Sequence, residues 1–259
     1  MIVDLHNHTP LCKHAEGSMS EYIEQAISKG VKIFGFSDHA PMDFDPKYRM
    51  RFEDMQQYEE DVLHVKKKYK NDITILLGYE IDYLQGHMDE RVLHANVDYL
   101  IGSVHFIDEW GFDNPEFIGE YENTDIDEIW QKYFDAIENM AKTELFDIVG
   151  HLDLIKVFKF MPTKNIIDIT RNALLAIKNA DMVLEINAAG YRKPIGEAYP
   201  SKELLEEAYK LDIPITFSSD AHAPEQVCMF DAKVKQLAQD VGYTECVYFI
   251  NREKKFLKF

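Results

Sequence analysis

The alternation of short apolar runs with amphipathic segments is the feature that most restricts how this 259-residue chain can fold. The apolar runs are dense and mostly do not alternate with polar residues, which is typical of parallel strands buried on both faces. We expect seven such strands, at residues 1–5, 31–37, 73–79, 97–104, 146–149, 182–187 and 213–218.

Segments with helical spacing lie between these strands. The first begins at a capping box formed by Ser18 and Glu21 and ends before Gly30. Further helices are expected at about 53–70, 125–143, 164–179, 202–211 and 231–240. Residues 106–123 are aromatic and acidic with little periodicity, so we expect a long functional loop there. Seven strands that alternate with helices predict an α/β fold: a closed β/α barrel one unit short of eight, or alternatively an open doubly wound sheet.

Neither an internal repeat nor a linker divides the sequence, so we expect one domain over residues 1–259. The net charge of −18 disfavours nucleic acid and anionic membranes as partners. The sequence has no membrane-length apolar run and does not begin like a signal peptide, which predicts a cytoplasmic protein. Cys12, Cys228 and Cys246 are too few and too scattered for a disulfide framework or a cysteine-based zinc site, so we expect them to be reduced.

Seven of the ten histidines and two carboxylates lie at or just beyond the C-terminal ends of the predicted strands. In a parallel β/α architecture these ends meet at one mouth, so residues distant in sequence share a pocket. Imidazole and carboxylate together favour zinc, manganese or iron over calcium or magnesium. The nine candidate ligands are His6, His8, His14, His39, Glu80, His105, His151, Asp220 and His222. Because nine ligands exceed the needs of one ion, two or three divalent ions are expected, and Glu80 can bridge them.

The other three histidines are better interpreted as solvent-exposed side chains. His64, His87 and His94 lie on a polar helix or in loops, where an isolated histidine is usually hydrated. We therefore expect no metal ligand among them.

Six short motifs together resemble those of the PHP (polymerase and histidinol phosphatase) phosphoesterases over nearly the whole chain. They are DLHNHT at 4–9, SDHA at 37–40, GYEIDY at 78–83, GSVH at 102–105, GH at 150–151 and SDAH at 219–222. The strings DYLIGSVHFIDEWGFD and NAAGYRKPIGEAYPS are similar to the histidinol-phosphatase branch. The resemblance implies a distorted (β/α)7 barrel and a trinuclear metal centre at the C-terminal mouth of the strands. It also implies hydrolysis of L-histidinol phosphate to L-histidinol and phosphate, late in histidine biosynthesis.

The same resemblance implies how the ligands are shared among three ions. By position, the first ion would take His6, His8, Glu80 and Asp220, the second His14, His39 and His222, and the third His105 and His151 with Glu80 shared. Asp38 is interpreted as a residue that orients an imidazole rather than as a ligand. The residues expected to take part in catalysis are Glu80, Asp220, His39 and Arg192.

Hydrolysis of a phosphate monoester needs an activated nucleophile and neutralisation of the phosphoryl charge. Metal ions can supply both, and cationic side chains then stabilise the equatorial oxygens. Arg192, within GYRKPIGE, is the first candidate because guanidinium binds phosphate bidentately; Lys156 and Lys159 are second candidates. All three could instead be surface residues. The acid for the leaving oxygen stays open between Asp220 and a coordinated water.

Acidic and aromatic residues in two predicted loops could recognise the organic half of the substrate. Asp43, Phe44 and Asp45 follow His39, and residues 106–113 follow His105. Within the second group, Asp108 and Asp113 could pair with the ammonium group of L-histidinol phosphate, while aromatic faces hold its imidazole. Two alternatives remain: a PHP phosphoesterase for other small phosphomonoesters or nucleotides, and a metal-binding PHP module without catalysis.

Overall fold

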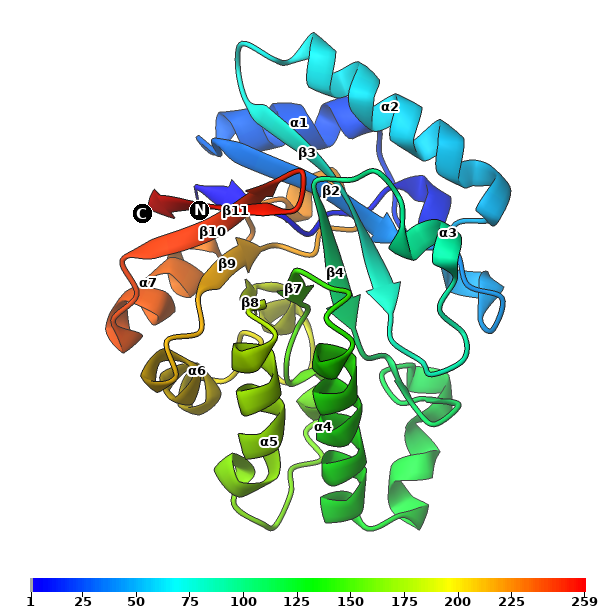
Figure 1. Ribbon diagram of the computed structural model, residues 1–259, viewed down its shortest axis with the longest axis vertical. Helices are drawn as coiled ribbons and strands as arrows, with labels where there is room; N and C mark the ends of the chain where they lie inside the picture. Colours follow the sequence, from blue (N-terminus) through cyan, green and yellow to red (C-terminus); the bar gives the residue numbers. More distant parts are fainter. Residues whose placement is uncertain (1) are drawn as a thin grey trace.

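Seven parallel strands form the centre of the computed structural model, which describes residues 2–259 (Figure 1). Neighbours in the sheet follow the order β1-β2-β3-β4-β7-β8-β9. The strands are β1 Val3–Asp4, β2 Ile33–His39, β3 Thr74–Asp82, β4 Tyr99–Ser103, β7 Ile148–Val149, β8 Val183–Asn187 and β9 Ile215–Ser218. Each overlaps one predicted strand; Met1, in the first predicted strand, lies outside the described residues.

The first and last strands meet, so the sheet curls into a nearly closed barrel. The Leu5 N–H donates a hydrogen bond to the Phe217 carbonyl at 3.1 Å, and Asn7 forms a parallel bridge with Ala221. The structure therefore confirms the distorted (β/α)7 barrel, and the open doubly wound alternative is wrong.

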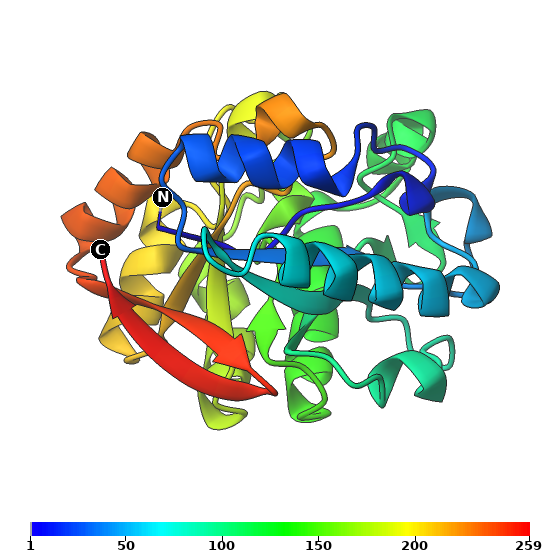
Figure 2. The same ribbon diagram turned by 90° about the horizontal axis from the view of Figure 1, so that it is seen from above.

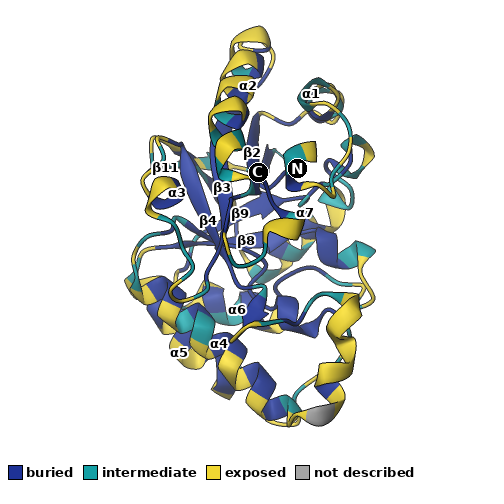
Figure 3. Cartoon of the chain, turned by 90° about the vertical axis from the view of Figure 1, so that its right-hand side faces the viewer, coloured by how far each residue is buried: buried dark blue, intermediate teal, exposed yellow. Residues whose placement is uncertain are grey.

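Helices cover the outer face of the barrel (Figures 1 and 2). They are α1 Met19–Ser28, α2 Met55–Lys68, α3 Glu90–Leu93, α4 Ile126–Lys142, α5 Ile166–Asn179, α6 Lys202–Lys210 and α7 Asp231–Val241. Short 3₁₀ segments are η1 Pro10–Cys12, η2 Pro46–Tyr48, η3 Phe52–Asp54, η4 Pro115–Asn123, η5 Leu154–Lys156, η6 Ala189–Arg192 and η7 Pro224–Gln226. Figure 3 shows the strands buried and the helices exposed on their outward sides. Within residues 2–259, no helix combines the length and the apolar character needed to cross a bilayer.

The capping box predicted for the first helix is present. The Ser18 backbone N–H donates to Glu21 Oε2 at 2.7 Å, and the Glu21 N–H donates to Ser18 Oγ at 3.4 Å. Two of the N–H groups that lack partners at a helix start are thereby satisfied, which explains why α1 begins at Met19.

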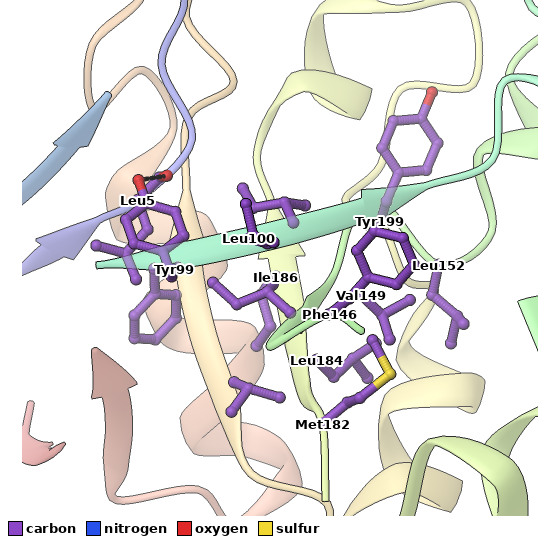
Figure 4. Packing of buried hydrophobic residues seen from close by; sticks show 14 of the residues in the cluster. Leu5, Tyr99, Leu100, Phe146, Val149, Leu152, Met182, Leu184, Ile186 and Tyr199 are labelled. Carbon is purple, nitrogen blue, oxygen red and sulfur yellow. Dashed lines mark hydrogen bonds between the residues drawn. The ribbon is translucent and has the colours of Figure 1, made fainter. Parts of the chain in front are cut away.

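Apolar side chains from opposite strands fill the barrel interior (Figure 4). Leu100 on β4 and Ile186 on β8 belong to this core, and both are inaccessible to solvent. The Tyr99 hydroxyl crosses the interior and donates to the Leu5 carbonyl at 2.5 Å. A Cβ atom at Gly35 would lie 2.0 Å from that hydroxyl oxygen, so only glycine fits where β2 passes Tyr99.

Two hairpins differ from the sequence prediction. Within the loop predicted at 106–123, β5 Phe106–Ile107 pairs with β6 Trp110–Gly111, and η4 follows. At the C-terminus, β10 Glu245–Ile250 pairs with β11 Glu253–Lys258, where no strands were predicted.

The C-terminal hairpin covers the N-terminal end of the barrel strands. Its turn residue Arg252 donates its N–H to the Asp98 carbonyl at 2.8 Å and forms an ion pair with Asp147. Lys254 Nζ lies 2.6 Å from Asp181 Oδ1. Asp98, Asp147 and Asp181 lie one or two residues before the starts of β4, β7 and β8. The hairpin therefore covers the N-terminal end of the barrel and leaves the C-terminal end open for the site.

Candidate metal centre

The predicted metal ligands come together at the C-terminal end of the barrel. Three groups have one ligand atom from each member within 4.8 Å of the others: His6, His8 and Glu80; His14, His39 and His222; and Glu80, His105 and His151. Asp220 adjoins the first group, because its Oδ1 lies 3.2 Å from His8 Nε2. With Asp220 added to the first, the groups correspond to the three ligand sets that the family resemblance implied, and the assignment of one ion to each set stays a prediction.

Glu80 belongs to two of these groups and adjoins the third through His39. Its Oε2 is 3.3 Å from His6 Nε2 and 2.8 Å from His39 Nδ1, whereas its Oε1 is 3.1 Å from His151 Nε2 and 3.8 Å from His105 Nε2. Burial would raise the pKa of Glu80, but the positive charge of His6 holds that pKa well below its usual range. The side chain is therefore a carboxylate whose Oε2 faces His6 and His39 and whose Oε1 faces His151 and His105, which suits a bridging ligand.

The group of His14, His39 and His222 consists of imidazoles alone. His14 Nε2 and His222 Nε2 are 3.0 Å apart. Burial lowers the pKa of His39 to about 4, and burial together with the charge of His8 lowers the pKa of His222 well below its usual value. These rings are neutral at physiological pH, so their lone pairs are available to a cation.

Asp38 orients an imidazole, as the sequence suggested. Its Oδ1 is 3.3 Å from His8 Nδ1 and accepts the His39 backbone N–H at 2.9 Å, while Oδ2 accepts the Thr9 hydroxyl. The second nitrogen of His8, Nε2, consequently faces Asp220 and Glu80. Fixing one ring nitrogen in this way presents the other to a metal.

Sequence reasoning missed two further orienting carboxylates, Glu185 and Asp82. Glu185 Oε1 lies 2.7 Å from His6 Nδ1, and Asp82 Oδ1 lies 2.6 Å from His105 Nδ1. Signals for both exist in the sequence. Glu185 is the single acid in the apolar run 182–187, and Asp82 follows Glu80 by two residues, which places both on one face of β3.

The charge of Asp82 dominates the titration of its histidine. Burial lowers the pKa of His105, but the carboxylate of Asp82 outweighs burial and raises this pKa to about 10. A cation that binds His105 must therefore displace a proton, which makes metal affinity pH-dependent.

Unpartnered buried atoms show that the cluster suits a cation. Within residues 2–259, His6 Nε2, His39 Nδ1 and Glu80 Oε2 are buried without a hydrogen-bond partner. Buried polar atoms are usually hydrogen-bonded, but His6 Nε2 and His39 Nδ1 lie 3.3 and 2.8 Å from Glu80 Oε2 without hydrogen-bond geometry, an arrangement that suits a shared cation. Nitrogen and carboxylate donors fit a divalent transition-metal ion.

Cys12 lies nearer to the cluster than the sequence suggested. Its sulfur lies within 4.8 Å of ligand atoms of His8 and His222. However, the thiol donates to the Thr9 carbonyl at 3.1 Å, and burial raises the pKa of Cys12 far above its usual value. All three cysteines are buried and unpaired.

Arg192 and Tyr199 bring two unsatisfied donors to the same region. Arg192 Nη2 donates to the Ser219 and Asp220 carbonyls at 2.9 and 2.8 Å. Among the described residues, Arg192 Nη1 and the Tyr199 hydroxyl are buried without a hydrogen-bond partner. The Tyr199 ring centroid is 6.4 Å from that of His151. Sequence reasoning selected Arg192 but not Tyr199.

Neither lysine that the sequence suggested as a phosphate ligand forms a hydrogen bond or ion pair with the predicted metal ligands within residues 2–259. Lys156 is buried, and its Nζ lies 2.8 Å from Asp153 Oδ2, 2.8 Å from Glu197 Oε1 and 2.9 Å from the Ala198 carbonyl. Its charge is therefore compensated by two carboxylates, and it ties two loops together. Lys159 is exposed. A role for either lysine in phosphate binding stays a prediction.

Asp113 and Asp108, the two acids predicted to bind the substrate, differ in how far they are buried. Asp113 is half-buried; burial raises its pKa, and the positive charges of His105 and His151 oppose that rise. Asp108 has 81% of its side chain exposed and lies 3.5 Å from Lys132 Nζ on α4. Asp113 thus lies within electrostatic range of His105 and His151, whereas Asp108 lies at the surface.

Aromatic rings line the neighbouring rim. Phe44 and Phe106 pack edge to face with ring centroids 5.2 Å apart, and His87 packs against Phe44 at 4.8 Å. The prediction that His87 is solvent-exposed is therefore wrong: the ring is half-buried because Phe44 covers it.

Comparison with known proteins assigns the chain to a family. A model of the PHP domain matches residues 4–189. The chain belongs to the PHP domain family. A Deinococcus radiodurans protein named "Probable histidinol-phosphatase" is 37% identical over 246 residues, covering 93% of this chain and 94% of that protein. The histidinol-phosphatase of Bacillus subtilis is 30% identical over 252 residues, covering 85% and 92%.

A solved structure has the same fold. The histidinol phosphate phosphatase of Lactococcus lactis, solved in complex with zinc, L-histidinol and phosphate, superposes with a TM-score of 0.81 over 98% of each chain at 21% identity. The fold of this PHP chain is thereby confirmed independently of its sequence motifs.

Proposed function

We propose that this PHP chain hydrolyses L-histidinol phosphate to L-histidinol and inorganic phosphate, a step of histidine biosynthesis, using bound divalent metal ions. The observation that carries the proposal is the set of three ligand groups at one barrel mouth, two of which share Glu80. The relatives named histidinol-phosphatase over nearly the whole chain support this substrate.

We infer a centre of three ions, of zinc, manganese or iron. One ion would be held by His6, His8, Glu80 and Asp220, one by His14, His39 and His222, and one by Glu80, His105 and His151. Three groups among the predicted ligands, two of them sharing Glu80, support this number. Asp220 and His222 lie beyond residue 189, where the family match ends, which supports a single PHP phosphoesterase domain over residues 1–259.

Side chains of the mouth would bind and orient the phosphoryl group. Bound ions polarise phosphoryl oxygens and make a nearby water more acidic. Arg192 Nη1 and the Tyr199 hydroxyl, which have no hydrogen-bond partner among the described residues, would donate to the equatorial oxygens, over which the negative charge is spread in the transition state. Asn187 Nδ2 holds Asp220 Oδ2 at 3.1 Å. Although burial would raise the pKa of Asp220, the charge of His6 keeps it well below its usual range, which favours a ligand role over proton donation.

The rim would select the organic half of the substrate. L-Histidinol phosphate ends in an ammonium and an imidazole group, which suit an anion beside aromatic faces. Asp113, with Phe44 and Phe106, offers such an environment next to His105. Of the two predicted acids, Asp113 is better placed than the surface residue Asp108.

The proposal is tested by phosphate release from L-histidinol phosphate, p-nitrophenyl phosphate and a nucleoside monophosphate, with metal content measured on the same preparation. We expect kcat/KM for L-histidinol phosphate to be at least about a hundredfold higher, as when a buried charged contact discriminates substrates. Similar values for all three would favour a phosphoesterase of other specificity. A fully metal-loaded protein without turnover would favour a non-catalytic module.

A further inference from the structure

Arg49 is a buried charge that neither the sequence motifs nor the proposed ligand sets include. It lies in the segment between β2 and α2, and only 4% of the residue is exposed. Its Nε donates to the Asp45 carbonyl at 2.5 Å and its Nη2 to Asp45 Oδ2 at 3.2 Å. Its Nη1 donates to Oδ2 of Asp82 on β3. A buried guanidinium is costly unless its N–H groups are hydrogen-bonded to acceptors. The hydrogen bonds of Arg49 therefore hold the carboxylates of Asp45 and Asp82 in place.

The second oxygen of Asp82 continues this chain of contacts to a candidate metal ligand. Asp82 Oδ1 lies 2.6 Å from His105 Nδ1, and His105 Nε2 lies 3.8 Å from Glu80 Oε1. A proton on Nδ1 keeps the lone pair on Nε2, the atom that faces Glu80. The orientation of Asp82 therefore decides whether His105 presents a ligand atom to the group that it forms with Glu80 and His151.

Arg49 also contacts the neighbour of His105 in sequence. Its guanidinium carbon lies 5.8 Å from the ring centroid of Phe106, the first residue of β5. The guanidinium thus contacts both the hydrogen-bond partner of His105 and the side chain of the residue next to it.

We propose that Arg49 is a positioning residue for the metal site of Glu80, His105 and His151, acting through Asp82. This inference rests on the proposed metal centre. The guanidinium of Arg49 then has two roles, because it holds Asp45 in the loop after β2 and also fixes the imidazole of His105 through Asp82. Among the described residues, the orienting carboxylates of the other histidines, Glu185 and Asp38, have no arginine partner. The effect of losing Arg49 is consequently confined to one site.

The test compares Arg49→Met with Arg51→Met in the full chain. Methionine keeps the apolar length of the side chain and removes its charge and donors. Arg51 is a matched control, because it lies two residues away, is 64% exposed and pairs with Asp54 at the surface. Zinc is the probe, and zinc binding is titrated against a chelator of known affinity. We expect Arg49→Met to bind one zinc ion per chain about 10- to 100-fold more weakly, with the other ions at parental affinity. Arg51→Met should match the parent.

Kinetics then separate positioning from direct substrate contact. If Arg49 acts through the metal site, saturating zinc should restore kcat for L-histidinol phosphate and leave KM near the parental value.

Arg49→Lys keeps the charge but only part of the donor geometry, so its zinc affinity should lie between those of the parent and Arg49→Met. Asp82→Asn provides a second route to the same site, and the double variant should bind zinc no more weakly than Asp82→Asn alone.

Three results would overturn the inference. Parental zinc affinity at every site in Arg49→Met would show that Asp82 needs no arginine. If Arg49→Met binds zinc equally more weakly at all sites and has a lower Tm in saturating zinc, Arg49 supports the structure as a whole. An unchanged zinc count in His105→Ala would show that no ion uses His105, and this result alone would also overturn the three-ion centre.

Discussion

Replacing Glu185 by glutamine tests whether a buried carboxylate sets the tautomer of a ligating histidine. Glu185 Oε2 accepts hydrogen bonds from the His151 backbone N–H at 2.6 Å and from Asn187 Nδ2 at 3.0 Å, while Oε1 is 2.7 Å from His6 Nδ1. An amide can preserve the first two contacts only with its oxygen toward His151, which turns its NH2 group toward His6. Nδ1 of His6 must then accept, and the ring proton moves to Nε2, the atom 3.3 Å from Glu80.

The expected loss of metal affinity is that of one histidine ligand whose lone pair no longer points at the metal. Removing the hydrogen-bond partner of a ligating histidine typically weakens metal affinity about 10- to 100-fold, or about 1.4 to 2.7 kcal/mol. The loss should fall on the site of His6 and His8. The assay is a zinc competition titration of the parent, Glu185→Gln and Glu203→Gln, an exposed control on α6.

Two results would refute this reasoning. If Glu185→Gln binds every zinc ion as tightly as the parent, the tautomer of His6 does not depend on the carboxylate. If the group of His14, His39 and His222 weakens equally, Glu185 supports the barrel mouth as a whole, because it contacts none of these residues.

Three further changes probe the centre and its rim. Glu80→Ala should lose more than one ion per chain, counted by native mass spectrometry, because Oε2 of Glu80 faces His6 and Oε1 faces His151, in different groups; the loss of a single ion would contradict bridging. Arg192→Ala should lower kcat/KM by about 2 to 4 kcal/mol with metal content unchanged, and parental kinetics would exclude phosphate contact. Asp113→Asn should reduce the preference for L-histidinol phosphate over p-nitrophenyl phosphate more than Asp108→Asn does; equal effects would contradict the placement of Asp113 at the rim.

The sequence predicted the strands and the clustering of the ligands for one physical reason. Parallel strands bring their C-terminal ends to one side, so the position of His39 or His151 relative to a strand already determines where its side chain lies. Neither residue needs a long-range contact to be placed there. The confirmed barrel and the three ligand groups both follow from this regularity.

The residues that sequence reasoning missed depend on contacts between distant elements. Arg49 reaches Asp82 across 33 positions, and Lys156 reaches Glu197 across 41. Nothing in the local pattern around Lys156 reveals that two carboxylates will compensate its charge, so a free phosphate ligand was an equally good interpretation. The C-terminal hairpin was missed because only its contacts with the strand starts, such as that of Arg252 with Asp98, give it a place in the barrel.

Closure of the barrel and assembly of the metal centre depend on the same seam. His6 and His8 follow the first strand and Asp220 follows the last, so the first ligand set is complete only when these two strands meet. The seam is held by the hydrogen bond of the His8 N–H with the Ala221 carbonyl at 2.9 Å. Asp4 strengthens it by accepting the Ser219 backbone N–H and hydroxyl at 2.9 and 2.6 Å. An ion that binds across the seam has no equivalent site in the unfolded chain, so its binding energy stabilises the closed barrel directly.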